Sequence, residues 1–232
     1  MQSTIIIGGS SGIGFELASE LLASGNQVST ACREEGRLGE LPGIEYQAFD
    51  ATQPDAELSL PETLDSLIYC PGTIQLKPFH RLSVEDFQGE LEVNFLGAVR
   101  VIQQALPTLK KSESASIVLF STVAVQTGLP FHAGIASAKG AIEGLTRSLA
   151  AEFAPKIRVN ALALSLTDTP LASSFLSTDE RVKASAERHP LKRVGDAAEV
   201  ARTVKWLIGP DAGFISGQVI TMDGGLSSLK LL

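Results

Sequence analysis

The chain has 232 residues, of which 44% are hydrophobic and 19% are charged, so it is long and apolar enough to bury a substantial core. This composition excludes an intrinsically disordered chain and a fibrous repeat. The formal net charge of −7 argues against binding to nucleic acid or to an anionic membrane, so we expect a small-molecule substrate instead.

The low charged fraction predicts a sheet that is covered on both faces, or a subunit interface, and therefore a homo-oligomer. Cys32 and Cys70 are the only cysteines, and neither stands in a CxxC or His/Cys pattern, so we expect no disulfide and no metal site. The chain enters an apolar segment at Thr4, without a signal-peptide pattern or an apolar run of membrane length. We therefore expect a cytoplasmic protein.

Short β-branched segments alternate with segments of helical periodicity along the whole chain. The predicted strands are residues 4–7, 27–31, 45–49, 66–70, 116–120, 158–164 and 218–222, and the predicted helices are residues 13–23, 84–106, 131–154 and 197–208. This succession predicts an α/β fold of the Rossmann type, with a doubly wound parallel sheet of about seven strands in one domain over residues 1–232. Residues 51–65 contain two prolines and are expected to hold a short crossover helix or none.

A glycine-rich turn follows the first predicted strand and precedes an amphipathic helix. Glycines at this place let the backbone turn tightly and approach a phosphate, while the helix N-terminus supplies unpaired N–H groups and a partial positive charge. The turn therefore predicts a nucleotide-phosphate site, with a purely structural turn as the alternative. Its candidate residues are Gly8, Ser10, Ser11, Gly12, Ile13 and Gly14.

The spacing Gly8-x-x-x-Gly12-x-Gly14 resembles the TGxxxGxG motif of the classical short-chain dehydrogenase/reductase family. Further segments resemble that family's motifs in the same order along nearly the whole chain: Asp50, Pro71-Gly72, Asn94 in residues 93–97, Lys139 in residues 137–139, and residues 157–161, 167–170, 217–220 and 223–225. The resemblance implies an NAD(P)-dependent oxidoreductase that acts on a carbonyl or an alcohol. It places Asp50, Gly72, Lys139 and Thr167 in the cofactor site. It also implies a homodimer or homotetramer that packs through residues 84–106 and 131–154, and a substrate lid around residues 171–188.

The end of the second predicted strand, Thr30-Ala31-Cys32-Arg33, bears on the choice of cofactor. It has no acidic side chain to accept a hydrogen bond from a ribose 2′-hydroxyl, whereas the Arg33 guanidinium could bind a 2′-phosphate. We therefore expect NADP(H) in preference to NAD(H). A solvated loop role for Arg33, and a turn-capping role for Asp50, are the alternatives.

The family's reaction uses a serine and the tyrosine of a YxxxK motif, and this chain departs from both. Lys139 matches the lysine, but Ile135 stands four residues before it, at the tyrosine position. Thr122, thirteen residues before Ile135, stands at the serine position and keeps a hydroxyl group. Ser121 is the alternative for the polarising role.

No other tyrosine is expected to replace the missing phenol, because Tyr46 and Tyr69 are the only two in the chain and both fall in predicted strands. His132 is a candidate proton donor, since it stands seven residues before Lys139 and has a suitable ordinary pKa. A surface histidine in a loop is the alternative interpretation. Asn94 is expected to interrupt its helix and to hold a water that links to Lys139, with a polar helix residue that finds its hydrogen bonds locally as the alternative.

Two functions remain open at this point. The first is an NADP(H)-dependent oxidoreductase with an altered proton-donor arrangement made by Lys139, Thr122, Asn94 and His132. The second is a nucleotide-binding pseudoenzyme that acts as a sensor or a partner subunit, as the apolar Ile135 would favour.

Overall fold

In the computed structural model, which describes residues 2–230, parallel strands form a seven-stranded sheet in the order β3-β2-β1-β4-β5-β6-β9. These strands are β1 (Ser3–Ile7), β2 (Gln27–Cys32), β3 (Glu45–Ala48), β4 (Ser66–Tyr69), β5 (Ala115–Thr122), β6 (Ile157–Leu164) and β9 (Val219–Met222). Each predicted strand overlaps one of them, so the predicted Rossmann-like α/β fold is confirmed.

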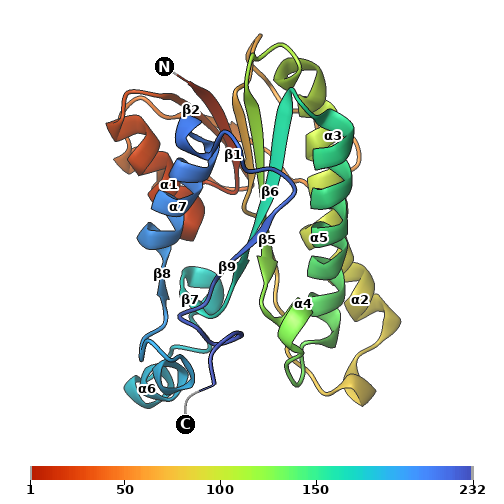
Figure 1. Ribbon diagram of the computed structural model, residues 1–232, viewed down its shortest axis with the longest axis vertical. Coiled ribbons are helices and arrows are strands. Elements are labelled where there is room, and N and C mark those ends of the chain that lie inside the picture. Colours follow the sequence, from red (N-terminus) through yellow and green to blue (C-terminus); the bar gives the residue numbers. More distant parts are fainter. Residues whose placement is uncertain (1, 231–232) are drawn as a thin grey trace.

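Helices cover both faces of this sheet (Figure 1). On one face lie α1 (Gly12–Ala23) and α7 (Ala197–Ile208), and on the other lie α3 (Gly97–Leu109) and α5 (Ala133–Phe153). Along β1, Ile5 and Ile7 pack into the core under α3 and α5, whereas Ile6 packs under α1 and α7. Successive side chains of a strand point to opposite faces of the sheet. Because both faces are buried here, successive residues are all apolar and the strand is a continuous apolar run.

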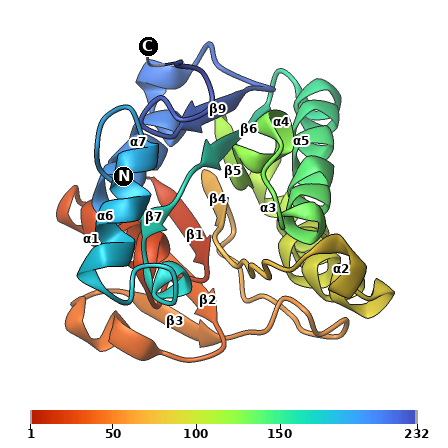
Figure 2. The ribbon, with the colours of Figure 1, turned by 90° about the horizontal axis from the view of Figure 1, so that it is seen from below.

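The carboxyl ends of the strands meet at one edge of the sheet, which Figure 2 shows from below. The chain reverses its winding at this edge, because β1 pairs with β2 on one side and with β4 on the other. A small second sheet of β7 (Thr167–Asp168) and β8 (Gly195–Asp196), together with α6 (Asp179–Arg188), lies over the same edge. Open α/β sheets bind their ligands in the crevice at such a reversal.

The predicted helix over residues 84–106 is divided into three parts. It consists of α2 (Val84–Leu91), a π-helical turn (Glu92–Leu96) and α3, and the buried Asn94 lies in the middle of the π-turn. Asn94 therefore interrupts its helix as expected. Single π-turns of this kind are rare and occur mostly at functional sites.

Other differences concern short or polar elements. Helix α6 lies inside residues 171–188 and was not predicted as a helix, because its residues are mostly polar and exposed. The short helix α4 (Ala124–Thr127) was also missed, as were 3₁₀ turns at Gly36–Glu40, Phe79–Arg81, Pro170–Ala172 and Pro210–Ala212. No helix forms in residues 51–65, which agrees with the expectation of a short or absent crossover helix.

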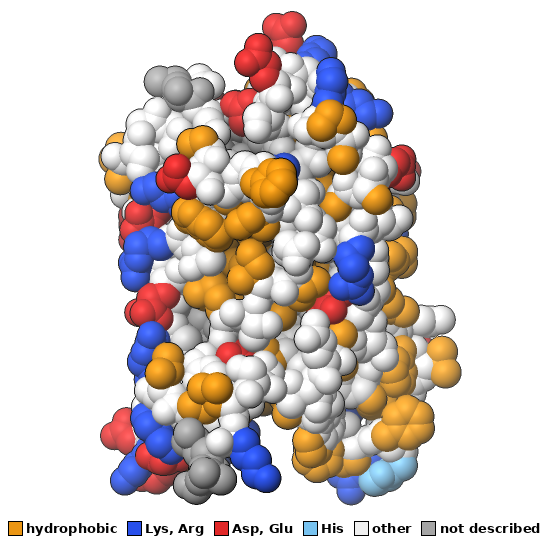
Figure 3. Space-filling model, viewed as in Figure 1, with side chains coloured by type: hydrophobic (Ala, Val, Ile, Leu, Met, Phe, Trp, Pro, Cys, Tyr) orange, Lys and Arg blue, Asp and Glu red, His pale blue; other side chains and the backbone are white. Residues whose placement is uncertain are grey.

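The surface combines both signs of charge with scattered hydrophobic side chains (Figure 3). Large exposed apolar side chains include Phe79, Phe131, Leu171 and Phe214. Of the helices formed by residues 2–230, none combines the length and the apolar character needed to cross a membrane.

The buried side chain of Arg158 connects β6 to the end of α7. Its guanidinium donates hydrogen bonds of 2.9 to 3.4 Å to the carbonyl oxygens of Leu207, Ile208, Gly209 and Ile215. The last carbonyls of a helix have no partner inside the helix, and a cation is favourable beside them. Arg158 therefore supplies hydrogen-bond donors to the last carbonyl groups of α7 and holds that helix against the sheet.

Replacing this side chain in Arg158→Met should lower the free energy of unfolding by about 3 kcal/mol, because several buried carbonyls lose a charged donor. The measurement is the midpoint of urea unfolding, at an unchanged slope. Arg202→Met, on an exposed part of α7, is the matched control and should change stability by less than about 0.5 kcal/mol. Equal losses in the two variants would contradict this role of Arg158.

Candidate cofactor and catalytic site

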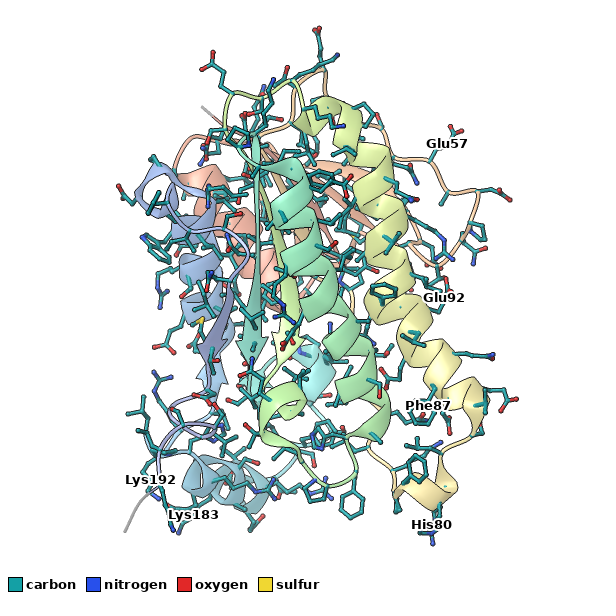
Figure 4. The ribbon with its side chains drawn as sticks, turned by 45° about the vertical axis from the view of Figure 1, so that its right-hand side comes forward. Glu57, His80, Phe87, Glu92, Lys183 and Lys192 are labelled. Carbon is teal, nitrogen blue, oxygen red and sulfur yellow. The ribbon has the colours of Figure 1, made fainter. Side chains whose placement is uncertain are left out.

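A cleft of about 1140 Å³ opens at the carboxyl edge of the sheet. In Figure 3 the molecule is hollowed at its lower end, and Figure 4 places Lys183 and Lys192 on one side of that end and His80 on the other. The structure brings all the candidates from the sequence to the walls of this cleft: Gly8, Ser10, Ser11, Gly12, Ile13, Gly14, Arg33, Asp50, Gly72, Asn94, Thr122, His132, Lys139 and Thr167.

The glycine-rich turn forms one end of the cleft. Gly8 and Gly12 have φ angles of 80° and 52°, in the left-handed region that favours glycine. A Cβ atom on Gly14 would collide with the carbonyl oxygen of Gly8, so the start of α1 packs directly against the turn. The exposed amino end of α1 and the bare backbone before it fit the diphosphate of a dinucleotide.

Two charged residues lie farther along the same wall. Arg33 follows β2 and is exposed, and in residues 2–230 it forms no ion pair. Asp50 accepts hydrogen bonds from the backbone N–H (2.9 Å) and the hydroxyl (2.7 Å) of Thr52, which hold the pKa of its carboxyl below the usual range. Asp50 is therefore an ionised turn cap as well as part of the cleft wall.

Lys139 projects from the middle of α5 into the opposite end of the cleft and is buried. A Cβ atom on Gly72 would lie 3.9 Å from its Nζ atom and 3.2 Å from Oδ1 of Asn94, so the loop after β4 passes close to both side chains. Burial lowers the pKa of Lys139 to about 8, although the nearby Glu90 carboxylate and Cys70 oppose that shift. A group with this pKa exchanges protons readily near neutral pH.

A network of buried hydrogen bonds surrounds Asn94. Its Nδ2 donates to the Glu90 Oε2 atom (2.8 Å) and to the Thr73 hydroxyl (2.9 Å), and its Oδ1 accepts from the Thr73 backbone N–H (3.3 Å). The sequence interpretation missed Glu90, which is almost fully buried. Its spacing of four residues before Asn94, one turn of helix, was a signal that could have found it.

The wall next to Lys139 is apolar where the family motif has a phenol. Ile135 lies in the first turn of α5, is 3% exposed and lines the cleft. Thr122 ends β5 beside it, and its Oγ1 accepts a weak hydrogen bond of 3.3 Å from the Ala124 N–H. The lining therefore offers a hydroxyl but no phenol at this point.

His132 is the residue just before α5 and lies on the rim of the cleft. Its Nδ1 lies 2.7 Å from the carbonyl oxygen of Pro130. A carbonyl oxygen only accepts hydrogen bonds, so Nδ1 is the donor in this contact.

Three other hydroxyl groups are either bonded to another partner or lie outside the cleft lining. The buried Tyr69 donates to the Val93 carbonyl oxygen (2.7 Å), and burial raises its pKa above the ordinary value. Tyr46 is on the edge strand β3 and is 36% exposed. Ser121 donates to the Glu143 carboxylate (2.8 Å), so the alternative of Ser121 as the polarising hydroxyl is not favoured.

A second feature that the sequence interpretation missed joins α6 to the end of β6. The buried His189 ring bonds through Nε2 to the Ser165 hydroxyl and through Nδ1 to the Ser185 carbonyl oxygen, both at 2.9 Å. The Thr167 hydroxyl donates to the Ser165 carbonyl oxygen (3.2 Å). Across the described residues, no three His, Cys, Asp or Glu side chains come together as a metal site would require.

Comparisons with known proteins agree with this geometry. The profile of the family described as enoyl-(acyl carrier protein) reductase matches residues 8–227. Tropinone reductase homolog At2g29290 of Arabidopsis thaliana is 37% identical, over 97% of this chain and 93% of that protein. The 3-oxoacyl-[acyl-carrier-protein] reductase MabA of Mycobacterium bovis is 30% identical, over 97% and 92%. The solved structure of ElxO with NADP bound has a TM-score of 0.87 at 26% identity, and the match covers 99% of this chain and all of that one.

The packing of the glycine-rich turn predicts the effect of one added methyl group. Gly14→Ala should weaken the binding of NADPH by at least about tenfold, or 1.4 kcal/mol, because the new Cβ displaces the turn that faces the diphosphate. Fluorescence titration with NADPH measures this. Gly144→Ala on α5, where a Cβ would meet nothing within 4 Å, is the control and should bind normally. Unchanged affinity in Gly14→Ala would remove the turn from the cofactor site.

Proposed function

Because the chain belongs to the classical short-chain dehydrogenase/reductase family, a family of oxidoreductases, we propose that it reduces a carbonyl or oxidises an alcohol with NADP(H) and uses Lys139 as its proton donor. The observation that carries this proposal is the buried Lys139 ammonium, with a pKa of about 8, in the same cleft as the glycine-rich turn.

The choice of NADP(H) is supported by the residues at the end of β2. The exposed Arg33 guanidinium lines the cleft where the ribose of a dinucleotide would lie, and its planar donors suit a phosphate. The ElxO structure contains NADP, which agrees with this choice. When bound, the nicotinamide supplies a hydride to a carbonyl carbon or removes one from an alcohol carbon.

The chain's own residues would manage the proton. In carbonyl reduction, the Lys139 ammonium gives a proton to the oxygen of the new alcohol and takes another from water. The Thr122 hydroxyl donates a hydrogen bond to the same oxygen and polarises it, while Asn94 holds the surrounding loop. Ile135 keeps the space beside the reacting atoms free of water.

The loss of a phenol is compatible with activity. A missing general acid costs roughly 10² to 10⁴ in rate, or about 3 to 5 kcal/mol. Holding the hydride donor and the carbonyl in contact supplies about 7 to 11 kcal/mol and requires no tyrosine. The pseudoenzyme alternative has no support from the two relatives described above, a tropinone reductase homolog and a 3-oxoacyl-[acyl-carrier-protein] reductase.

The substrate is expected to be a small molecule with an apolar part. Side chains of Ile74, Leu76, Leu129, Leu171 and Phe175 line the cleft beyond Lys139. We propose that residues 171–188, with α6, cover this part as a lid. Relatives named for tropinone and for 3-oxoacyl thioesters suggest bicyclic ketones and 3-oxoacyl thioesters as the first carbonyls to test. Assembly into a homodimer or homotetramer through α2, α3 and α5 completes the proposal.

The pH dependence of carbonyl reduction tests the proton donor. The ammonium is the active form, so kcat/KM should be constant below pH 8 and fall above it, as Lys139 loses its proton. Lys139→Arg should lower kcat/KM by about 10² to 10⁴ and abolish this break, because a guanidinium does not release a proton in this range. His132→Ala is the matched variant and should keep both the break and the affinity for NADPH. Loss of turnover in His132→Ala alone would transfer the donor role to His132.

A second test restores the phenol. Ile135→Tyr should reduce carbonyls at least about tenfold faster than Ile135→Phe, because the two aromatic rings differ only in a hydroxyl that can reach the substrate oxygen. The measurement is NADPH oxidation with a panel of aldehydes, ketones and 3-oxoacyl thioesters. If neither the parent chain nor Ile135→Tyr turns over any of these substrates, the proposed reaction is wrong.

A further inference from the structure

We propose that Glu90 is a positioning residue of this site: its buried carboxylate fixes Asn94 and the loop after β4, and it keeps Lys139 in its charged form. Only the expected change in turnover depends on the proposed function. The hydrogen bonds of Glu90 and the titration of Lys139 do not depend on it.

Every hydrogen bond that Glu90 makes is consistent with an ionised carboxylate. Oε1 accepts from the Gln75 backbone N–H (2.7 Å), and Oε2 accepts from the Thr73 hydroxyl (2.9 Å) and from Asn94 Nδ2 (2.8 Å). The Gln75 N–H and the Asn94 amide nitrogen can only donate, and the Thr73 hydroxyl already accepts from Asn94 Nδ2, so this network suits a carboxylate that accepts from all three. The buried group therefore carries a negative charge.

A buried negative charge is costly unless a positive charge lies near it. Lys139 is the buried cation of the same cleft, and α5 carries it past Glu90. A Cβ atom on Gly134 of α5 would lie 3.6 Å from the Glu90 Cγ. One on Gly72 would lie 3.2 Å from the Asn94 Oδ1 and 3.9 Å from the Lys139 Nζ. At this proximity the Glu90 carboxylate favours the charged form of Lys139.

Cys70 faces Lys139 from the end of β4, but burial raises the pKa of its thiol to about 12, so it stays neutral. On α5 itself, Glu143 is committed to Ser121 and lies 3.8 Å from Arg147.

Glu152 is exposed near the far end of α5, and His132, just before the helix, is neutral or positive but never an anion. His132 therefore cannot balance an ammonium. Glu90 is left as the group that stabilises the charged form of Lys139 against the desolvation that favours the neutral amine.

The same carboxylate also sets the shape of the cleft. Gly72, Thr73 and Ile74 line the cleft, and Thr73 and Gln75 attach this loop to Glu90. Asn94 is held from α2 by both the carboxylate and the carbonyl oxygen of Glu90, the latter at 3.0 Å. Loss of the carboxylate would release the loop and the amide together.

The test uses the full chain with Glu90→Gln. This substitution keeps the size of the side chain, but it removes the negative charge and turns one of the two accepting oxygens into an NH₂ group, which donates. The pKa of Lys139 should fall by about one unit, because a carboxylate near an ammonium shifts its pKa by at least that much. Titration of the ¹³Cε chemical shift of Lys139 in ¹³C-lysine protein measures this without turnover, with the signal assigned by its loss in Lys139→Arg. At pH 9 the protonated fraction, and hence kcat/KM, should be about tenfold lower than in the parent chain.

Glu92→Gln is the matched control. Glu92 stands two residues before Asn94, but its side chain pairs with Arg100 on the outer side of the helix layer (Figure 4). This variant should leave the Lys139 titration and the pH profile unchanged. If Glu90→Gln does not fold, Glu90→Asp keeps the charge but shortens the reach to Asn94, so it should lower turnover while the pKa of Lys139 changes less.

An unchanged Lys139 titration in folded Glu90→Gln, or unchanged turnover and titration in Glu90→Asp, would overturn the inference. Neither result would affect the proposed reaction. Conversely, full turnover in Lys139→Arg would refute Lys139 as the donor, while a shifted titration in Glu90→Gln would still support the role of Glu90.

Discussion

The ammonium group of Lys139 is the charge around which the reaction end of the molecule is organised. A cation placed in an apolar interior is unstable unless nearby groups compensate it. Three irregular features surround this ammonium: the side-chain-free Gly72 that passes close to it, the π-turn that carries Asn94, and the buried Glu90, whose carboxylate supplies the opposite charge. Tyr69 adds support from β4, because its hydroxyl bonds to the Val93 carbonyl oxygen in the same turn.

The two ends of the cleft are built in different ways. Backbone geometry forms the phosphate end, since Gly8, Gly12 and Gly14 leave no room for side chains or need φ angles that other residues avoid. Individual side chains form the proposed reaction end, where one substitution can change the lining of the cleft and leave the fold intact. Ile135 illustrates this, because it fits a buried position in α5 without disturbing the cofactor wall.

The sequence was a good guide wherever a regular pattern decides the structure. Alternation of apolar strands and helices was sufficient for the sheet, and the glycine spacing was sufficient for the turn before α1. It was a poor guide to contacts between distant segments. Nothing local indicated that Ser121 would bond to Glu143 or that His189 would reach Ser165. Only the four-residue spacing to Asn94 pointed to Glu90.

Asp50 shows a further limit, because the sequence set a turn cap against a cofactor contact as alternatives, whereas the structure shows the cap and leaves the cofactor contact as a prediction. Its carboxylate caps a turn through Thr52 and also lines the cleft. A sequence pattern shows which residue type stands at a given position. It does not show which groups will donate hydrogen bonds to that residue's carboxylate, because those groups are brought together only in the folded chain.

The π-turn at Glu92–Leu96 means that the site depends on the length of the chain as well as on its side chains. A π-turn holds one residue more than an α-helical turn, and each residue rotates a helix by about 100°. Deleting any one residue of this segment would rotate α2 relative to α3 and turn Glu90 away from the cleft while every side chain of the site remained in the gene. A sequence comparison that ignores a single-residue gap in this segment would therefore find every site residue present in a chain whose side chains no longer meet in the cleft.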